Sequence, residues 1–378
     1  MGRFVIDARY VRSRPSGIGN YVAALTDRLP ALAPDAHFRF WTHPERPDLA
    51  QAPNVRCVVV PAVADGLRTL LLPSVLDRLE PDDVLHFPYS LLGRGLPCPT
   101  VVTIQDLMWF EHAALVDGRP LVRRAREKFY QTGMRWAFTH ATRVIATSNA
   151  TADRIRAVYP ASATRIRVIP LAAGPAFAAP ADLQAAQREA ARLVGSGAPY
   201  YIAVGKNEPY KAHDIALHAF AEAARPGELL VLVQRESSGR GIPQLARKLG
   251  VADRVRWIPP VSETNLVTLL QGATALLQPS LVEGFGLPVL EAMACGCPVI
   301  ASDTPALVEV SGGAGLHARV GDAAALADQI RRLHDGSLRD ELRQRGFERA
   351  RIFTWDRTAA ETLEVYRDVQ RTGNHTGW

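Results

Sequence analysis

Two glutamates, Glu283 and Glu291, lie eight positions apart in the stretch SLVEGFGLPVLEAMACGC. Glu283 precedes a Gly-Phe-Gly sequence, and Glu291 is surrounded by apolar residues. A carboxylate buried among apolar groups is very costly unless it is paired or hydrogen-bonded. Hydroxyl groups of a sugar or a ribose would provide such hydrogen bonds. The alternative is that Glu283 is a loop carboxylate and Glu291 a surface residue.

The residues between these glutamates predict a loop that leads into a helix. Pro288 suits the first helical turn and Gly296 the end of the helix, which we expect to begin at Leu287. Amides at the start of such a helix lack intrahelical acceptors and lie at the positive end of its dipole. The amides concerned are those of Gly284, Phe285 and Gly286.

Two lysines, Lys206 and Lys211, lie in a second loop, AVGKNEPYKAHD, close after Gly205 and an apolar run. Two ammonium groups at the end of a strand can neutralise a diphosphate, above all one that is becoming a leaving group. The alternative is that both lysines are solvated and have no role.

A third loop contains Gly17 and Gly19, ahead of a helix expected from about Asn20. Such a loop can hold a phosphate or a carboxylate. A dinucleotide fingerprint would require a glycine where Val22 stands, and a simple tight turn explains the glycines equally well.

Short apolar runs alternate with amphipathic segments along the chain, a pattern typical of parallel sheets covered by helices on both faces. We expect strands at 3–8, 37–42, 56–61, 83–88, 100–106, 143–148, 167–171, 200–205, 229–234, 255–259, 275–280, 298–303 and 314–318. A Pro-containing linker near 172–185 divides them into two series. The predicted fold class is α/β, with two tandem Rossmann-like doubly wound domains facing a cleft.

The domains are expected at 1–175 and 176–355, with a helix at 182–194 opening the second. Thr354 is a suitable N-cap for a last helix, over 356–378.

The composition indicates a soluble globular protein, with 47% hydrophobic and 22% charged residues among 378. No apolar run approaches the roughly 18–20 residues that span a bilayer, and the N-terminus does not have the sequence of a signal peptide, so we expect a cytoplasmic location. The four cysteines suggest buried thiols rather than disulfides or a metal site. Residues 1–175 carry a net charge of +7 and the remainder −1, which suggests an anionic partner for the first domain.

Much of that charge lies in the predicted helix 118–138. Its apolar residues Val122, Ala125, Phe129 and Trp136 would share one face, surrounded by Arg123, Arg124, Arg126, Lys128 and Arg135. Such a helix suits an anionic membrane surface or a lipid-diphosphate acceptor. Equally, it could be a solvated helix whose apolar face packs into the core.

Taken together, these stretches resemble the retaining glycosyltransferases of family 4, which have the GT-B fold and an E-x7-E signature. The signature is the stretch from Glu283 to Glu291, and weaker similarities follow in the family's order over nearly the whole chain. They are IDAR…SGIGNY, DVLHFPYS, TIQDLMWFEH, VIATSNATADRI, RVIPLAAG, VGKNEPYK and FTWDRTAAETLEVYR. The SGIGNY opening and TIQDL look most like those of mannosyl- and rhamnosyltransferase-type members.

The resemblance implies that the nucleotide-sugar donor binds the C-terminal domain and the acceptor the N-terminal one. Glu291 would hold the ribose hydroxyls, Glu283 those of the transferred sugar, and Lys206 and Lys211 the diphosphate. The last helix would cross back to the N-terminal domain. The implied donor-binding residues are Gly17, Gly19, Gln105, Asp106, Gly205, Gly284, Phe285, Gly286, Leu287 and Glu291.

The family's mechanism requires neither an enzyme nucleophile nor a cofactor, and the sequence lacks the D-x-D motif of metal-dependent transferases. The leaving phosphate would help to deprotonate the acceptor. One departure is Gln105, where relatives often have histidine; an amide cannot titrate, so a proton-handling role is excluded. Another is Gln234-Arg235, where relatives commonly have glycine.

The resulting hypothesis is a retaining transferase that moves mannose from GDP-mannose to a glycan or lipid-linked acceptor in surface polysaccharide assembly. Its expected location is the cytoplasm or the cytoplasmic face of the inner membrane. The alternatives are a UDP- or dTDP-sugar donor, or a non-enzymatic basic protein that binds membrane or RNA. A nicotinamide dehydrogenase would leave both glutamates unexplained. No nucleic-acid partner and no metal are expected.

Overall fold

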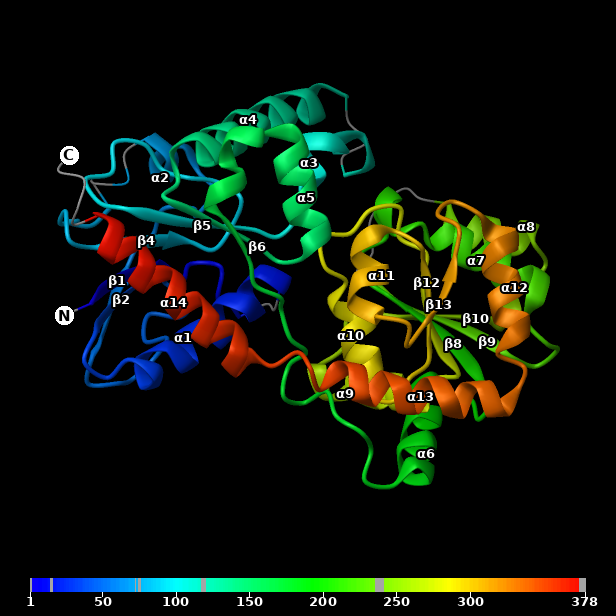
Figure 1. The fold of residues 1–378 in the computed structure, drawn as a ribbon. Coiled ribbons are helices and arrows are strands. Elements are labelled where there is room, and N and C mark those ends of the chain that lie inside the picture. The colour runs from blue at the N-terminus through cyan, green and yellow to red at the C-terminus, as the bar shows by residue number, and fades with distance from the viewer. Residues whose placement is uncertain are drawn as a thin grey trace. The chain divides into compact units, whose positions relative to one another are not determined.

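The structure is a computed structural model that describes residues 2–13, 16–71, 73, 76–116, 120–234 and 241–373 (Figure 1). The chain separates into two compact units. The N-terminal unit comprises Met1–Leu171 and Thr354–Trp378, and the C-terminal unit comprises Ala172–Phe353. Each unit is built around one parallel sheet.

The sheet of the N-terminal unit has seven strands in the order β3-β2-β1-β4-β5-β6-β7. The strands are β1 (Arg3–Asp7), β2 (His37–Thr42), β3 (Val55–Val59), β4 (Val84–Phe87), β5 (Thr100–Ile104), β6 (Arg143–Ala146) and β7 (Ile166–Val168). The helices are α1 (Gly17–Leu32), α2 (Leu67–Leu71), α3 (Met108–Glu111), α4 (Pro120–His140), α5 (Asn149–Val158) and α14 (Trp355–Gly373). In Figure 1, α1 and α14 lie on one face of this sheet, and α4 and α5 lie on the other.

The sheet of the C-terminal unit has six strands in the order β10-β9-β8-β11-β12-β13. The strands are β8 (Tyr200–Val204), β9 (Leu229–Val233), β10 (Val255–Ile258), β11 (Ala275–Gln278), β12 (Val299–Ser302) and β13 (Leu316–Ala318). The helices are α6 (Leu183–Val194), α7 (His213–Ala223), α8 (Ile242–Lys248), α9 (Glu263–Gly272), α10 (Leu287–Ala294), α11 (Pro305–Ser311), α12 (Ala323–Arg332) and α13 (Gly336–Ala350).

The predicted fold class, two doubly wound parallel sheets, is confirmed. Every apolar run expected to be a strand overlaps one, and all strand pairs of the described residues are parallel. The central strands are buried along their length; β9, LLVLV, is an example. Such strands appear in the sequence as continuous apolar runs because helices cover both faces of the sheet.

Helix α14 is held in the N-terminal unit by a buried polar network. Thr354 caps it, as predicted, because its Oγ1 accepts a hydrogen bond from the Arg357 amide at 3.2 Å. Tyr366 on α14 lies with its hydroxyl 2.7 Å from Nδ1 of His86 on β4, and Nε2 of that histidine lies 2.8 Å from Thr103 Oγ1 on β5. Burial lowers the pKa of His86 to about 3, so the ring is neutral and has one donor and one acceptor nitrogen.

The predicted start of helix α1 was wrong. The helix begins at Gly17 rather than near Asn20, so both loop glycines lie in its first turn. Ser16 sets this start because its side chain accepts a hydrogen bond from the Gly19 amide. A Cβ at Gly19 would lie 2.7 Å from the Tyr10 carbonyl oxygen, so close backbone packing accounts for that glycine.

Of the predicted apolar face of α4, Phe129 and Trp136 pack against the core, whereas the first two residues do not. Val122 and Ala125 are exposed, whereas Met134, Ala137 and Phe138 are buried. The helix therefore contacts the core from Phe129 onward, and the spacing of its buried residues is that of one helical face. Residues 118 and 119 of the predicted segment lie outside the described part of the chain.

Candidate active site

The candidate site lies where the strand order of the C-terminal sheet reverses. Strands β8 and β11 are neighbours, and the chain proceeds from them toward opposite edges of the sheet. In open parallel sheets, ligands bind beyond the carboxyl ends of the strands at this point. The two loops that follow these strands are joined by a hydrogen bond from the Leu281 amide to the Tyr210 carbonyl oxygen, at 2.7 Å.

Lys211 and Glu283 form an ion pair across these loops. Lysine Nζ lies 2.6 Å from Glu283 Oε1, and each side chain is only 11% exposed. The same oxygen accepts hydrogen bonds from Gln278 Nε2 at 2.9 Å and from Ser280 Oγ at 2.8 Å. The carboxylate is therefore fixed in orientation. Within the described part of the chain these donors all reach Oε1, which leaves Oε2 as the oxygen better placed to accept a ligand hydroxyl.

The backbone around Lys211 is strained. Ala212 adopts a left-handed conformation with φ 49°, which among the described residues is the one positive φ outside glycine. This conformation costs roughly 1–2 kcal/mol for a residue with a Cβ. It directs Lys211 toward Glu283 and the next side chain, His213, into the core, where Nδ1 lies 2.5 Å from Gln234 Nε2. Strain of this kind clusters at functional sites.

Two glycines shape the surroundings of the ion pair. Gly205 has φ 134°, and a Cβ there would lie 3.6 Å from Lys211 Cε. Gly286 has φ 102° and immediately precedes α10; a Cβ there would lie 2.5 Å from Leu307 Cδ2. Helix α10 begins at Leu287, as predicted. Phe285 is buried and its ring centroid lies 5.9 Å from that of Phe353.

Glu291 lies on α10, among buried Val289, Leu290, Ala292 and Met293. Loss of water around the carboxyl group raises its pKa to about 7, and the nearby charge of Glu263 adds to this shift, whereas Lys211 opposes it. The charges of Lys211 and of a second carboxylate therefore both act on Glu291. Glu263, at the start of α9, was not identified from the sequence, where it resembles an ordinary acidic residue in the first turn of a helix.

The two lysines differ in exposure and in ion pairing. Lys206 is exposed and forms no ion pair within the described ranges, whereas Lys211 is nearly buried. Their action as a pair on a diphosphate stays a prediction. Of the other departures noted in the sequence, Gln234 is buried, and Arg235 lies outside the described residues.

The remaining predicted donor-binding residues lie in the N-terminal unit. Besides Gly17 and Gly19 in α1, they are Gln105 and Asp106, which follow β5. Asp106 Oδ1 accepts a hydrogen bond from the Met108 amide at 2.9 Å. Gln105 accepts a hydrogen bond through its backbone oxygen from Thr147 Oγ1 at 3.2 Å, but its side-chain Nε2 is buried without a partner in the described structure.

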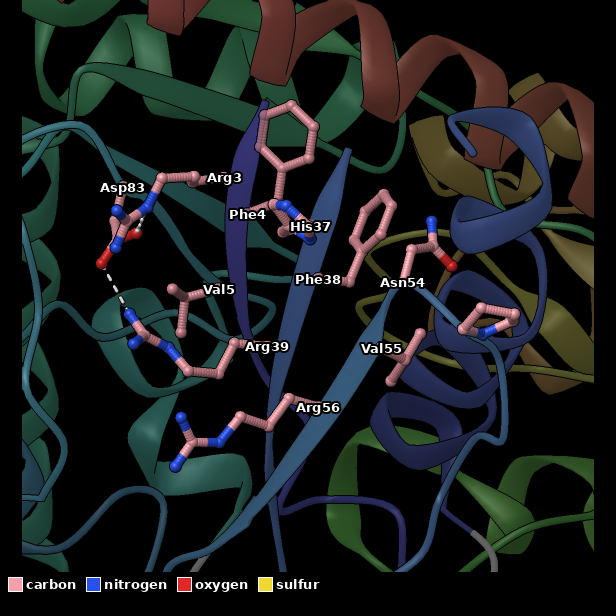
Figure 2. Close-up of a pocket in the computed structure, with 11 residues that line it drawn as sticks. Arg3, Phe4, Val5, His37, Phe38, Arg39, Asn54, Val55, Arg56 and Asp83 are labelled. Atoms are coloured by element: carbon pink, nitrogen blue, oxygen red, sulfur yellow. Dashed lines mark hydrogen bonds and ion pairs between the residues drawn. The ribbon is translucent and has the colours of Figure 1, made fainter. Parts of the chain in front are cut away.

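A surface pocket elsewhere does not belong to this site. Figure 2 shows it at the amino ends of β1, β2 and β3 in the N-terminal unit, where Arg3, Arg39 and Arg56 lie on one face of the sheet. Asp83 accepts hydrogen bonds from Arg3 Nε at 2.9 Å and Arg39 Nη2 at 2.5 Å. Doubly wound sheets bind their ligands at the opposite edge, beyond the carboxyl ends of the strands.

No group of three or more His, Cys, Asp or Glu side chains that could hold a metal ion occurs in the described ranges. The cysteines are free thiols. Burial raises the pKa of Cys295 to about 12 and that of Cys297 further, so both are protonated at neutral pH.

Comparisons with known proteins agree with this geometry. The family model described as glycosyl transferases group 1 matches residues 187–351, and that of Glycosyltransferase Family 4 matches residues 15–173. The D-inositol 3-phosphate glycosyltransferase of Acidothermus cellulolyticus is 33% identical over 307 residues, 76% of this chain and 67% of that protein. The enzyme of the same name from Actinosynnema mirum is 33% identical over 371 residues, 87% of each chain.

Solved structures share the fold. Sucrose-phosphate synthase of Thermosynechococcus elongatus superposes with a TM-score of 0.75 at 21% identity, covering 98% of this chain and 100% of that one. Anabaena HepE in complex with UDP-glucose gives a TM-score of 0.65 at 15% identity, with both chains fully covered.

Two doubly wound units of this kind define the GT-B class, and the protein is an enzyme of that class, a glycosyltransferase. Within the class, the chain belongs to the group 1 glycosyltransferases with a family 4 N-terminal domain. The names of its relatives identify neither mannosyl nor rhamnosyl transferases, so the subtype expected from the sequence does not follow from family membership.

The raised pKa of Glu291 predicts a pH-dependent effect of the Glu291→Gln substitution. The ordinary value is 4.5 and the folded value about 7, so the folded state resists ionisation of this group and loses stability as pH rises through that window. The isosteric amide cannot ionise. We therefore expect Glu291→Gln to raise the melting temperature at pH 8 by several degrees and to leave it nearly unchanged at pH 5. An equal change at both pH values would show that Glu291 does not titrate there.

Proposed function

We propose that this glycosyltransferase moves a hexose from a nucleotide sugar to a hydroxyl group of a glycan or lipid-linked acceptor, with retention of anomeric configuration. The observation that carries the proposal is the ion pair of Lys211 and Glu283 at the switch point of the C-terminal sheet. A nucleotide sugar offers what each partner needs, since its diphosphate is an anion for the lysine and its sugar hydroxyls are donors for the carboxylate.

The donor would divide the ion pair without leaving either charge alone. In the free protein, Lys211 and Glu283 neutralise one another. When the diphosphate enters, it replaces Glu283 as the anionic partner of Lys211. The lysine then stabilises the charge that develops as the glycosidic C–O bond breaks. Glu291, one helical turn inside α10, would accept ribose hydroxyls in its ionised form.

Retention requires no nucleophile from the protein. The acceptor oxygen would attack the anomeric carbon on the face from which the diphosphate departs. The acceptor proton then passes to a phosphate oxygen of the leaving group, so charge and atoms balance without a side-chain base. Neither a metal ion nor a cofactor is invoked, because cationic side chains and the start of α10 lie where the diphosphate is expected.

GDP-mannose is our first candidate donor, and UDP- and dTDP-sugars are the alternatives. A protein of the same fold, Anabaena HepE, has been solved with UDP-glucose, and the relatives are named D-inositol 3-phosphate glycosyltransferases. Neither name specifies mannose. The site residues described above would contact parts common to all nucleotide sugars, so the base and the sugar must be identified by binding.

Thermal denaturation with nucleotides tests the donor class. We expect GDP, UDP or dTDP at millimolar concentration to raise the melting temperature, because a ligand that binds only the folded state stabilises it by mass action. NAD and a short RNA are the controls and should produce no shift. Absence of a shift with every nucleoside diphosphate would refute the proposed function.

Substitution of the lysines tests the assignment of roles. Lys211→Ala should lower kcat by about 100-fold or more, since it removes a charge that acts on the leaving group. Lys206→Ala should have a smaller effect because that side chain is exposed, and Lys248→Ala, an exposed lysine on α8, should behave as wild type. Equal turnover in Lys211→Ala and Lys248→Ala would remove Lys211 from the mechanism.

We also propose that the exposed half of α4 contacts an anionic membrane surface. Leu121 is 81% exposed and Val122 38%, and exposed Arg124, Arg126 and Lys128 accompany them. Exposed apolar residues flanked by cations suit the headgroup region of a bilayer. No helix in the described part of the chain combines the length and apolarity needed to cross a membrane.

Sedimentation with lipid vesicles tests this surface. The wild type should bind phosphatidylglycerol-containing vesicles, not pure phosphatidylcholine, and binding should weaken at high salt. Arg124→Glu with Lys128→Glu should abolish it. Arg188→Glu with Lys248→Glu makes the same charge change on exposed residues of the C-terminal unit and should preserve binding. If both double variants bind equally, α4 is not the contact surface.

A further inference from the structure

Four aromatic side chains gather at the carboxyl edge of the sheet in the N-terminal unit. Trp109 on α3 stacks on Tyr130 of α4, with ring centroids 5.1 Å apart and an interplanar angle of 13°. Tyr10, after β1, packs on Tyr89, after β4, with centroids 5.0 Å apart. Trp109, Tyr130 and Tyr10 remain partly exposed. This edge is where a doubly wound unit binds its ligand.

Two carboxylates accompany these rings. Asp65, between β3 and α2, accepts a hydrogen bond from the Tyr130 hydroxyl through Oδ2 at 2.8 Å. Asp106 lies close enough to influence the same tyrosine: burial first, then Asp65 and more weakly Asp106, raise the pKa of Tyr130. Asp65 acts likewise on Tyr10. Both carboxylates are partly exposed, so they are accessible to a ligand.

Gln105 adds a donor in need of an acceptor. It directly precedes Asp106, and its Nε2 is buried with no hydrogen-bond partner in the described structure. A buried donor without a partner is energetically unfavourable. An oxygen atom of a bound ligand would satisfy it.

The charges at this edge do not favour an anionic ligand. Among the described residues here, Arg9 is buried against Asp7, Arg12 pairs with Glu45, and Arg154 pairs with Glu111. Arg126 lies over the Trp109 ring, 5.9 Å from its centroid. With Asp65 and Asp106 present, one arginine leaves the cluster itself with a net charge of −1.

We propose that Asp65, Asp106 and the Trp109–Tyr130 stack form the acceptor subsite and that they bind an uncharged saccharide. Aromatic faces cover the apolar C–H surface of a sugar ring, and carboxylates accept hydrogen bonds from its hydroxyl groups. This inference rests on the proposed function but goes beyond it. It also predicts an acceptor different from the D-inositol 3-phosphate in the names of the relatives. The phosphate of such an acceptor would be repelled by the carboxylates at this edge.

A merely structural role for the cluster makes a different prediction. If Asp65 served only to anchor Tyr130, removing the tyrosine hydroxyl would have the same effect as changing Asp65. If Asp65 binds the acceptor, Asp65→Asn should be the more damaging of the two, because Tyr130→Phe keeps both the carboxylate and the stacked ring. Comparison of the two variants therefore separates the roles.

Ligand-observed NMR on the full-length protein, with a saturating nucleoside diphosphate present, tests the proposal. The probes are methyl glycosides of mannose, glucose, galactose and rhamnose, against glucose 6-phosphate and myo-inositol 1-phosphate. We expect at least one glycoside to bind and both phosphates to bind more weakly. Binding of the phosphates alone, or of no glycoside, would overturn the proposal. A protein that binds no nucleoside diphosphate would instead refute the proposed function.

The same assay applied to variants locates the subsite. Asp65→Asn and Trp109→Ala should each weaken glycoside affinity by about tenfold or more, as expected for loss of a hydrogen bond to a charged group or of a stacking surface. Tyr130→Phe should weaken it less than Asp65→Asn. Asp153→Asn, an exposed aspartate on α5, is the matched control. Nucleoside diphosphate binding should persist in every variant, which verifies folding. Unchanged glycoside affinity in Asp65→Asn and Trp109→Ala would place the acceptor elsewhere.

Discussion

The ion pair between Lys211 and Glu283 is the interaction on which the candidate donor site depends. Its partners are 72 residues apart in the sequence and come from loops that follow neighbouring strands. With 11% of each side chain exposed, neither charge could be left alone without a large desolvation cost. A ligand that separates the pair must offer an anion to Lys211 and hydrogen-bond donors to Glu283. A molecule that carries both an anionic group and hydroxyl groups meets this requirement.

The surrounding backbone is arranged to keep these groups in place. Ala212 holds a left-handed conformation next to Lys211, and Gly286 does so before α10. Gln278 and Ser280 fix the carboxylate from the strand end. Glu291 lies deeper, with a pKa near neutrality, so its charge can respond to a bound ribose. The corresponding edge of the sheet in the N-terminal unit carries aromatic rings and aspartates. These side chains suit a neutral ligand rather than a diphosphate.

Much of this architecture could be predicted from sequence because parallel strands appear as apolar runs, and Pro288 and Gly296 delimit a helix. Lys211, Glu283 and Glu291 were identifiable as single residues because their charges stand out from the local sequence. The first two follow apolar strands, and Glu291 lies in an apolar helix. Their contacts were not, since local periodicity carries no information about residues far apart. Asp65 and Trp109 were missed because the subsite they form comes from three separate segments. The start of α1 was predicted too late because both glycines were assigned to a loop. They lie in the first turn of the helix, which Ser16 caps.

The central claim is that a nucleotide sugar binds at the switch point of the C-terminal sheet. Amide hydrogen exchange measured with and without the nucleoside diphosphate that stabilises the protein tests it most directly, because it locates the ligand. We predict increased protection in the segments 204–213 and 278–291, which contain the Lys211 loop, the Glu283 loop and the start of α10. Protection confined to other segments of the chain would contradict this account.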